Sequence, residues 1–260
     1  MKRIVSAHQP NFMPYLGFFD KMIRSDVFVI RDEVQFVERD YHHRNRIRID
    51  SPRGEAPQCK WIRVPVVKEQ IDLKHIRIKS RVRDKNVPWN IFMLRQIRSN
   101  YATAPYFVKY FPELDLILRI QTTRLIDLNM AIINWLQRCF GIDTEVIYAS
   151  QLNYGKTGDP TKDLVKIAEA VDADVYLSGS GGRAYLNQAF FDASGMEILF
   201  QSFNHPVYQQ QYAGFVPNLA AIDALFNVGN ILSSQRVRQS TFEDATSAMS
   251  TRAPKGASNR

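Results

Sequence analysis

The sequence has few cysteines and no long apolar run. Its two cysteines, Cys59 and Cys139, lie far apart and form no C-x-x-C pair, which argues against a disulfide framework and a structural zinc site. No stretch reaches the roughly 20 apolar residues that a membrane-spanning helix needs. The apolar segment before His8 is too short for the core of a signal peptide. We therefore expect a cytoplasmic protein without a membrane span.

Acidic residues are too few to balance the basic ones. The 260 residues contain 34 Lys and Arg against 26 Asp and Glu, which gives a formal net charge of +8. Most of the excess lies in the segment from Lys60 to Arg98, which is either a solvated face or a docking site for an anionic partner. Acidic carrier proteins, phosphorylated metabolites, nucleic acids and anionic membranes are all partners of this kind. We expect a protein or a metabolite in preference to a polynucleotide.

Apolar patterns predict an α/β fold. Continuous apolar runs at residues 3–7 and 27–30 flank a helical pattern at 15–24, and such runs suit the buried strands of a parallel sheet. Further strands are predicted at 144–148, 174–177 and 197–200, and further helices from Asp159 and over 185–193 and 218–226.

Two other segments depart from this alternation of strand and helix. Residues 35–65 predict a β-hairpin with its turn at 51–54, and residues 88–141 predict a helical insert. We therefore expect one domain over residues 1–235 with a Rossmann-like, mostly parallel sheet. The small polar residues of 236–260 predict a disordered tail.

Polar residues follow the first two predicted strands. His8 begins the segment His8-Gln9-Pro10-Asn11 at the carboxyl edge of the sheet, where open α/β sheets bind ligands. Its ordinary pKa suits a general base, although a histidine can also cap the strand end by bonding a carbonyl. Asp32 follows the second strand and can orient the imidazole or bind a substrate amine. Gln9 and Asn11 are expected to bind substrate.

Two more polar segments are candidates for substrate binding. The guanidinium groups of Arg44 and Arg46, which flank Asn45, match carboxylate or phosphate, and a salt-bridged hairpin is the alternative. A Gly-rich loop follows a predicted strand and can cradle a phosphate or an oxyanion with its backbone N–H groups, unless it is only a flexible turn. It lacks the spacing of a P-loop and of a dinucleotide fingerprint. This loop consists of Ser178, Gly179, Ser180, Gly181 and Gly182.

Metal ligands are not expected. His42 and His43 are adjacent, so on a strand their side chains point to opposite faces and cannot hold one ion together.

A set of short motifs lies along the chain, namely His8-Gln9-Pro10 with Pro14 and Gly17, Asp26, Asp32, Arg44-Asn45-Arg46, Trp61-Ile62-Arg63-Val64-Pro65-Val66, Tyr176-Leu177-Ser178-Gly179, and Pro206-Val207-Tyr208-Gln209 with Phe215, Pro217, Asp223, Leu225, Asn227 and Gly229. In combination these motifs resemble the WbqC-like protein family, over nearly the whole chain up to about residue 232. Members of that family occur with bacterial polysaccharide and O-antigen genes. The resemblance implies a role in modifying an amino sugar by transfer of an acyl or aminoacyl group to its amine. Where a Leu-Ser pair is expected before Ile222, this chain has Ala220 and Ala221.

The resulting hypothesis is a transferase that forms an amide on a nucleotide-linked amino sugar. His8 would act as base, Asp32 would orient it, and the loop at 178–182 would donate hydrogen bonds to the oxyanion. No tightly bound cofactor is expected. An acyl donor carried on phosphopantetheine would bring an acyl-carrier protein to the basic segment.

Two other function classes stay open. The first strand and its loop are similar to those of the nucleotidylyltransferase superfamily, so nucleotidyl transfer or adenylate-forming ligation is one alternative, although Asn11 stands where the second histidine of that superfamily belongs. A nucleic-acid-binding module that stacks bases on Trp61 and Trp89 is the other.

Overall fold

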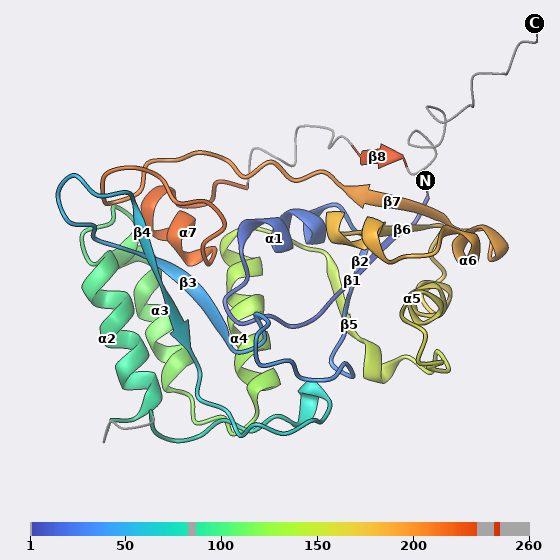
Figure 1. Ribbon diagram of the computed structural model, residues 1–260, viewed down its shortest axis with the longest axis horizontal. Helices are drawn as coiled ribbons and strands as arrows, with labels where there is room; N and C mark the ends of the chain where they lie inside the picture. The colour runs from blue at the N-terminus through green and yellow to red at the C-terminus, as the bar shows by residue number, and fades with distance from the viewer. Residues whose placement is uncertain (1, 83–86, 233–241, 245–260) are drawn as a thin grey trace, which may run out of the picture.

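Five parallel strands form the centre of the protein in the computed structural model, which describes residues 2–82, 87–232 and 242–244 (Figure 1). They are β1 (Ile4–His8), β2 (Val27–Ile30), β5 (Glu145–Tyr148), β6 (Val175–Ser178) and β7 (Glu197–Gln201). Their spatial order is β5-β2-β1-β6-β7. Counted along the chain, this is the order 3-2-1-4-5 of a Rossmann sheet. The prediction of a Rossmann-like, mostly parallel sheet is therefore confirmed.

Both faces of this sheet are covered, which explains its unbroken apolar strands. On β2, Phe28 and Ile30 join one apolar cluster and Val27 and Val29 join the other, because successive side chains of a strand point to opposite faces. The first cluster contains α1 (Leu16–Ile23) and α7 (Ile222–Val228). The second contains residues of α5 (Pro160–Glu169) and α6 (Gln188–Ala193).

The helical insert and the hairpin extend the first cluster. The insert folds as α2 (Trp89–Tyr101), α3 (Phe107–Arg119) and α4 (Leu125–Cys139), and the hairpin as β3 (Arg44–Ile49) and β4 (Gln58–Arg63). Both lie at the left of Figure 1, away from α5 and α6. Short 3-10 turns are η1 (Leu73–His75), η2 (Ala149–Gln151) and η3 (Ser180–Ala184). No helix of the described residues has both the length and the apolar character needed to cross a membrane.

Some predicted boundaries shift for local reasons. The helix predicted over 185–193 begins only at Gln188, where the Asn187 side chain accepts a hydrogen bond from the N–H of Ala189. The helix predicted over 218–226 begins at Ile222, because Ala220 instead pairs with Tyr15 in an isolated β-bridge. In the predicted tail at 236–260, Phe242–Asp244 form β8, antiparallel to β7. The rest of that tail lies outside the described residues.

A buried carboxylate joins the hairpin, the insert and the C-terminal helix. Asp223 on α7 accepts hydrogen bonds from the hydroxyls of Tyr101 (2.7 Å) and Tyr208 (2.8 Å) and from the amide of Gln210 (2.8 Å). Tyr101 in turn accepts the backbone N–H of Arg48 on β3 at 2.9 Å. The charge is therefore compensated by three donors, and each of these hydrogen bonds contributes to stability.

Replacing Tyr208 by Phe is expected to lower the free energy of unfolding by about 1.5–3 kcal/mol, the usual contribution of a hydrogen bond to a charged group. Urea denaturation measures the change. Tyr185→Phe is the matched control, because Tyr185 is 63% exposed, and its effect should stay within about 0.5 kcal/mol. Equal stability of Tyr208→Phe and the wild type would contradict this account of the Asp223 network.

Candidate functional site

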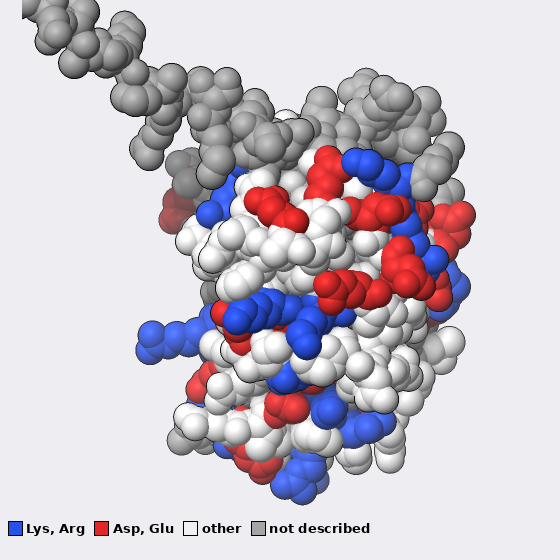
Figure 2. All heavy atoms as spheres, turned by 90° about the vertical axis from the view of Figure 1, so that its right-hand side faces the viewer, with Lys and Arg blue, Asp and Glu red and all other residues white. Residues whose placement is uncertain are grey.

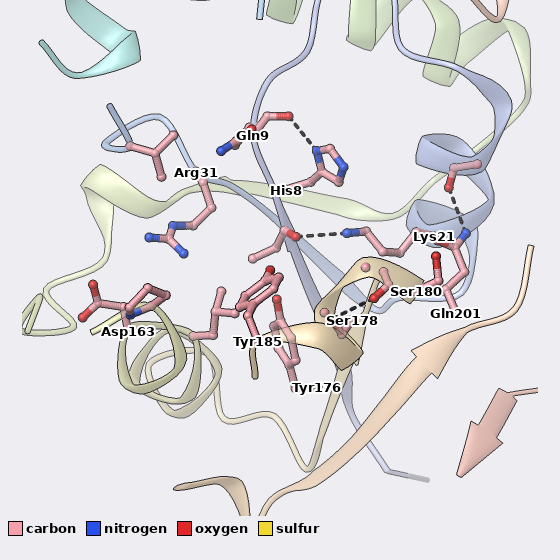
Figure 3. A pocket seen from close by; sticks show the side chains of 18 of the residues that line it. His8, Gln9, Lys21, Arg31, Asp163, Tyr176, Ser178, Ser180, Tyr185 and Gln201 are labelled. Atoms are coloured by element: carbon pink, nitrogen blue, oxygen red, sulfur yellow. Dashed lines mark hydrogen bonds between the residues drawn. The ribbon is translucent and has the colours of Figure 1, made fainter. Parts of the chain in front are cut away.

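A pocket opens at the point where the strand order reverses. β1 and β6 are neighbours, but the chain continues from β1 to β2 on one side and from β6 to β7 on the other. The diverging connections leave a crevice outside the carboxyl ends of the two strands, the usual ligand site in open α/β sheets. The cavity has a volume of about 780 Å³ and is lined by His8 and Gln9 after β1 and by the loop at 178–182 after β6 (Figure 3).

His8 ends β1 and is held in one orientation. Its Nδ1 lies 2.9 Å from the carbonyl oxygen of Gln9, and because a carbonyl only accepts, Nδ1 carries the proton and Nε2 the lone pair. The ring packs edge-on against Phe18 with centroids 4.9 Å apart. Burial, reinforced by the charge of Lys21, lowers the pKa of His8 to about 3. The imidazole is therefore neutral at pH 7.

Gln9 and the loop that follows β1 are held by the buried side chains of His42 and Asn129. The Gln9 Oε1 accepts a hydrogen bond at 2.8 Å from Nε2 of His42, whose Nδ1 accepts the N–H of Val37. Asn129 on α4 donates to the carbonyls of Pro10 (2.7 Å) and His42 (2.8 Å). The helical insert thus fixes the loop that carries His8 and Gln9.

The Gly-rich loop forms the opposite wall. A Cβ at Gly182 would lie 2.1 Å from the Ser178 Oγ, so any other residue there would have to displace the Ser178 hydroxyl at the strand end. At Gly179 and Gly181 an added Cβ would meet no heavy atom within 4 Å. Ser180 and Gly181 begin η3, where no carbonyl of the preceding turn accepts their N–H groups, and both residues line the pocket.

Lys21 of α1 is a lining residue that the sequence did not single out. Its side chain is 4% exposed, and its Nζ donates to the Ala7 carbonyl at 3.1 Å. Burial lowers the pKa of Lys21 to about 7. In Figure 3, Lys21 and Arg31 approach the end of β1 from opposite sides. A signal did exist in the sequence, since Asp20-Lys21 interrupts the apolar pattern of a short helix.

Arg31 also lines the pocket, but its charge is partly compensated. Its Nε lies 2.5 Å from the Glu33 carboxylate, which also accepts the hydroxyl of Tyr154 at 3.0 Å. Lys156 lines the same side and donates to the Glu33 carbonyl at 2.8 Å. Asp163, which is buried, lines this side as well. This side of the pocket therefore combines two cations, Arg31 and Lys156, with two buried acids, Glu33 and Asp163.

Asp32 lies at the predicted edge but does not orient His8, which corrects that expectation. Its two carboxylate oxygens accept the N–H (3.0 Å) and the hydroxyl (2.6 Å) of Ser150, and the residue is not part of the pocket lining. Neighbouring residues at a strand end point in opposite directions. Arg31 therefore faces the pocket, whereas Asp32 turns away from it. Asn11 is likewise absent from the lining and is 9% exposed.

The Arg44-Asn45-Arg46 segment lies on the hairpin and does not line the pocket. Asn45 is buried and donates to the Met13 carbonyl at 2.6 Å, so its role in this structure is to hold the loop before α1. The guanidinium groups of Arg44 and Arg46 lie 4.4 and 5.8 Å from the ring centroid of Trp61. The expectation that these three residues join the same site as His8 is therefore not met.

The positive charge is spread over the surface. No described residue between Lys60 and Arg98 lines the pocket, and two cations of this segment, Lys68 and Arg77, pair with Glu38 and Glu69. On the face that carries α5 and α6, a band of Lys and Arg side chains crosses the middle while Asp and Glu gather above it (Figure 2). Among the described residues, no cluster of three or more His, Cys, Asp or Glu side chains has the arrangement of a metal site.

This chain is similar to known proteins. The model of the WbqC-like protein family matches residues 9–233, which include β6 and the Gly-rich loop. An uncharacterized protein of Mycobacterium tuberculosis, Rv1507c, is 30% identical over 232 residues, which are 88% of this chain and 95% of that protein. No solved structure matches significantly. Because the family model covers nearly the whole chain, the protein is a member of the WbqC-like protein family.

Proposed function

We propose that this protein is an acyl or aminoacyl transferase that forms an amide on a nucleotide-linked amino sugar in bacterial polysaccharide or O-antigen biosynthesis. The proposal is supported above all by the pocket at the β1–β6 crevice, which combines cations, a neutral imidazole and a Gly-rich loop. A volume of about 780 Å³ is in the range of small-molecule sites and leaves room for a nucleotide-linked sugar.

The chemistry requires a proton acceptor beside the attacking amine. The amine nitrogen attacks the carbonyl carbon of the acyl donor, a C–N bond forms, and the bond to the donor thiol or alcohol breaks. His8 supports the step because its Nε2 is an available lone pair in a ring fixed by the Nδ1 bond to Gln9. The proton that leaves the amine goes to Nε2 and then to the departing sulfur or oxygen.

The carbonyl oxygen becomes negatively charged as the amine attacks. The N–H groups of Ser180 and Gly181 line the same pocket and can donate to that oxygen. Tyr185, at the same wall and 63% exposed, offers an aromatic face to the sugar or the base. An acyl-carrier protein, if it delivers the donor, would dock on the basic segment from Lys60 to Arg98.

Mass spectrometry of the product tests the proposed reaction. The purified protein is incubated with a nucleotide-linked amino sugar and, in parallel, with acyl-carrier-bound, coenzyme A-bound and aminoacyl donors. The expected product is heavier than the sugar substrate by the acyl group, and its fragments place that group on the amine.

Release of pyrophosphate or AMP from a nucleoside triphosphate would instead indicate nucleotidyl transfer or adenylate-forming ligation. Binding of random DNA tighter than about micromolar at physiological salt would favour a nucleic-acid-binding module. Absence of any acylated sugar with all donor classes would overturn the transferase proposal.

A further inference from the structure

Lys21 is a buried cation without an acidic partner among the described residues. Its only hydrogen-bond acceptor there is the neutral carbonyl of Ala7, and no carboxylate of the described chain lies within ion-pair distance of its Nζ. An ammonium group has three donors, so two remain for another partner. Burying a charge without a counter-ion is costly, and proteins retain such groups where a ligand supplies the counter-charge.

The neighbouring acid cannot serve Lys21. Asp20 precedes it on α1, but both oxygens of its carboxylate bind Arg24, at 2.8 and 2.9 Å, and one of them also accepts the Gln201 amide at 2.6 Å. On the other side of the pocket, Arg31 has Glu33 as its counter-ion. Lys156 lies on that side too, where Asp163 is a second acid in the lining. The two cations of that side are matched by two acids, so the uncompensated positive charge of the pocket is concentrated at Lys21.

The space that lies before Lys21 suits an anion. The Gly-rich loop lines the same cavity. The space beside Gly179 and Gly181 is open, because no heavy atom lies within 4 Å of the position that a Cβ would take there. Bare backbone of this kind lets an anion approach N–H groups closely. Gln201, which also lines the cavity, donates hydrogen bonds to the carbonyl of Gly17 at 2.9 Å and to the Asp20 carboxylate at 2.6 Å, so both acceptors already have a partner in the protein.

We propose that Lys21 is the anchor of a phosphate-binding subsite, which takes the diphosphate of the nucleotide-linked substrate between its ammonium group and the loop at 178–182. This inference rests on the proposed function for the identity of the substrate, but not for the chemistry of the anion. A phosphate there supplies the counter-charge that the protein does not provide.

Occupation of this subsite also affects His8. The charge of Lys21 is the second cause, after burial, of the low pKa of His8. An anion bound at Lys21 cancels that charge, so it raises the pKa of His8 and strengthens it as a proton acceptor. The base would thus gain strength only when the anionic substrate is bound.

Calorimetric titration with inorganic pyrophosphate, uridine diphosphate and uridine tests the subsite without any acyl transfer. We expect the wild type to bind both phosphate compounds and Lys21→Met to bind them at least tenfold more weakly, with uridine unaffected. Lys162→Met is the matched control, because Lys162 is exposed on α5 and does not line the pocket. Tighter binding of uridine diphosphate than of pyrophosphate identifies the nucleotide as the source of the anion, and equal binding identifies free phosphates.

The pH dependence of binding adds a second readout. Lys21 must be protonated to bind the anion, so wild-type affinity should fall roughly tenfold or more from pH 6.5 to 8.5, as expected for a pKa of about 7. Other titratable or charged groups face this region, namely His8, Tyr15, Asp20, Arg31, Lys156, Asp163, Tyr176 and Tyr185. The pH dependence of binding to Lys21→Met measures the contribution of these groups and of the phosphate itself. The variant should not show the tenfold fall in affinity between pH 6.5 and 8.5.

Two outcomes would overturn the inference: a wild-type protein that binds neither phosphate compound, and a Lys21→Met variant that binds them as tightly as the wild type. Phosphate binding at Lys21 without any acylated sugar would leave the subsite in place and remove the transferase proposal. Amide formation by Lys21→Met with an unchanged KM would instead keep the transferase proposal and remove the subsite.

Discussion

Replacing His8 by alanine is expected to lower kcat for amide formation by about 10²–10⁴, the usual contribution of a positioned proton acceptor. The variant keeps the pocket but loses the Nε2 lone pair at the end of β1. KM should change little if the phosphate groups are bound by Lys21 and the Gly-rich loop. Single-turnover formation of the acylated sugar measures the effect on the chemical step.

The stability of His8→Ala should change by only about 1 kcal/mol. The side chain makes one hydrogen bond, to the carbonyl of the next residue, and one edge contact with Phe18. That cost applies above about pH 7. Because burial lowers the pKa of His8 to about 3 while an unfolded histidine keeps its ordinary value of 6.5, the unfolded wild type takes up a proton below pH 6.5 that the folded state does not. The wild type should therefore lose stability relative to His8→Ala as the pH falls, by about 2 kcal/mol at pH 5.

His205→Ala is the matched control for His8→Ala. His205 makes the same local bond, from Nδ1 to the carbonyl of the next residue at 2.9 Å, but it does not line the pocket. Its replacement should leave kcat within about twofold of the wild type. A His8→Ala variant with a lower melting temperature and full turnover would show that His8 only caps the strand, and would remove it from the mechanism.

The sequence was sufficient to locate the crevice but not to assign every residue in it. Unbroken apolar runs such as 27–30 indicated strands buried on both faces, and this placed His8 and the loop at 178–182 at one edge. Strand order could not be obtained in this way, because it depends on which strands pair and not on local patterns. The shared pocket depends on the pairing of β1 with β6, residues that are far apart in the sequence.

Side-chain direction explains the site residues that the sequence misplaced or missed. Asp32 and Arg31 are adjacent, and only the actual end of β2 decides which of them faces the pocket. The Arg44 to Arg46 segment has the right chemistry for an anion, but the hairpin packs it against Trp61 and the loop before α1. Lys21 was missed because a lysine on a short amphipathic helix is normally solvated, whereas here β1 and α1 enclose it.

Replacing Lys21 by methionine is expected to stabilise the protein while weakening phosphate binding. Methionine has a similar length and no charge, so the variant avoids the cost of a buried ammonium group. The pKa of Lys21, lowered by burial from 10.5 to about 7, sets an upper bound on that cost, at about 1.4 kcal/mol for each pKa unit. Loss of the bond to the Ala7 carbonyl offsets about 1 kcal/mol. We therefore expect a gain of about 2–4 kcal/mol in the free energy of unfolding at pH 6.5.

The gain should depend on pH in one direction. Below pH 7 the lysine is protonated in both the folded and the unfolded chain, and the folded state carries the full cost of the charge. Between pH 7 and 10.5 the folded state releases the proton while the unfolded chain keeps it, so wild-type stability rises toward that of the variant. Urea denaturation at pH 6.5 and pH 9.5 should show the difference between the two proteins shrinking.

Lys162→Met again serves as the control, because an exposed lysine should change stability by no more than about 0.5 kcal/mol at either pH. A destabilised Lys21→Met, or a difference from the wild type that is the same at both pH values, would mean that the ammonium group is compensated in the folded protein. In that case Lys21 would not need a ligand to supply its counter-charge. Stabilisation together with weaker phosphate binding, by contrast, is the result expected of a residue retained for binding at the expense of stability.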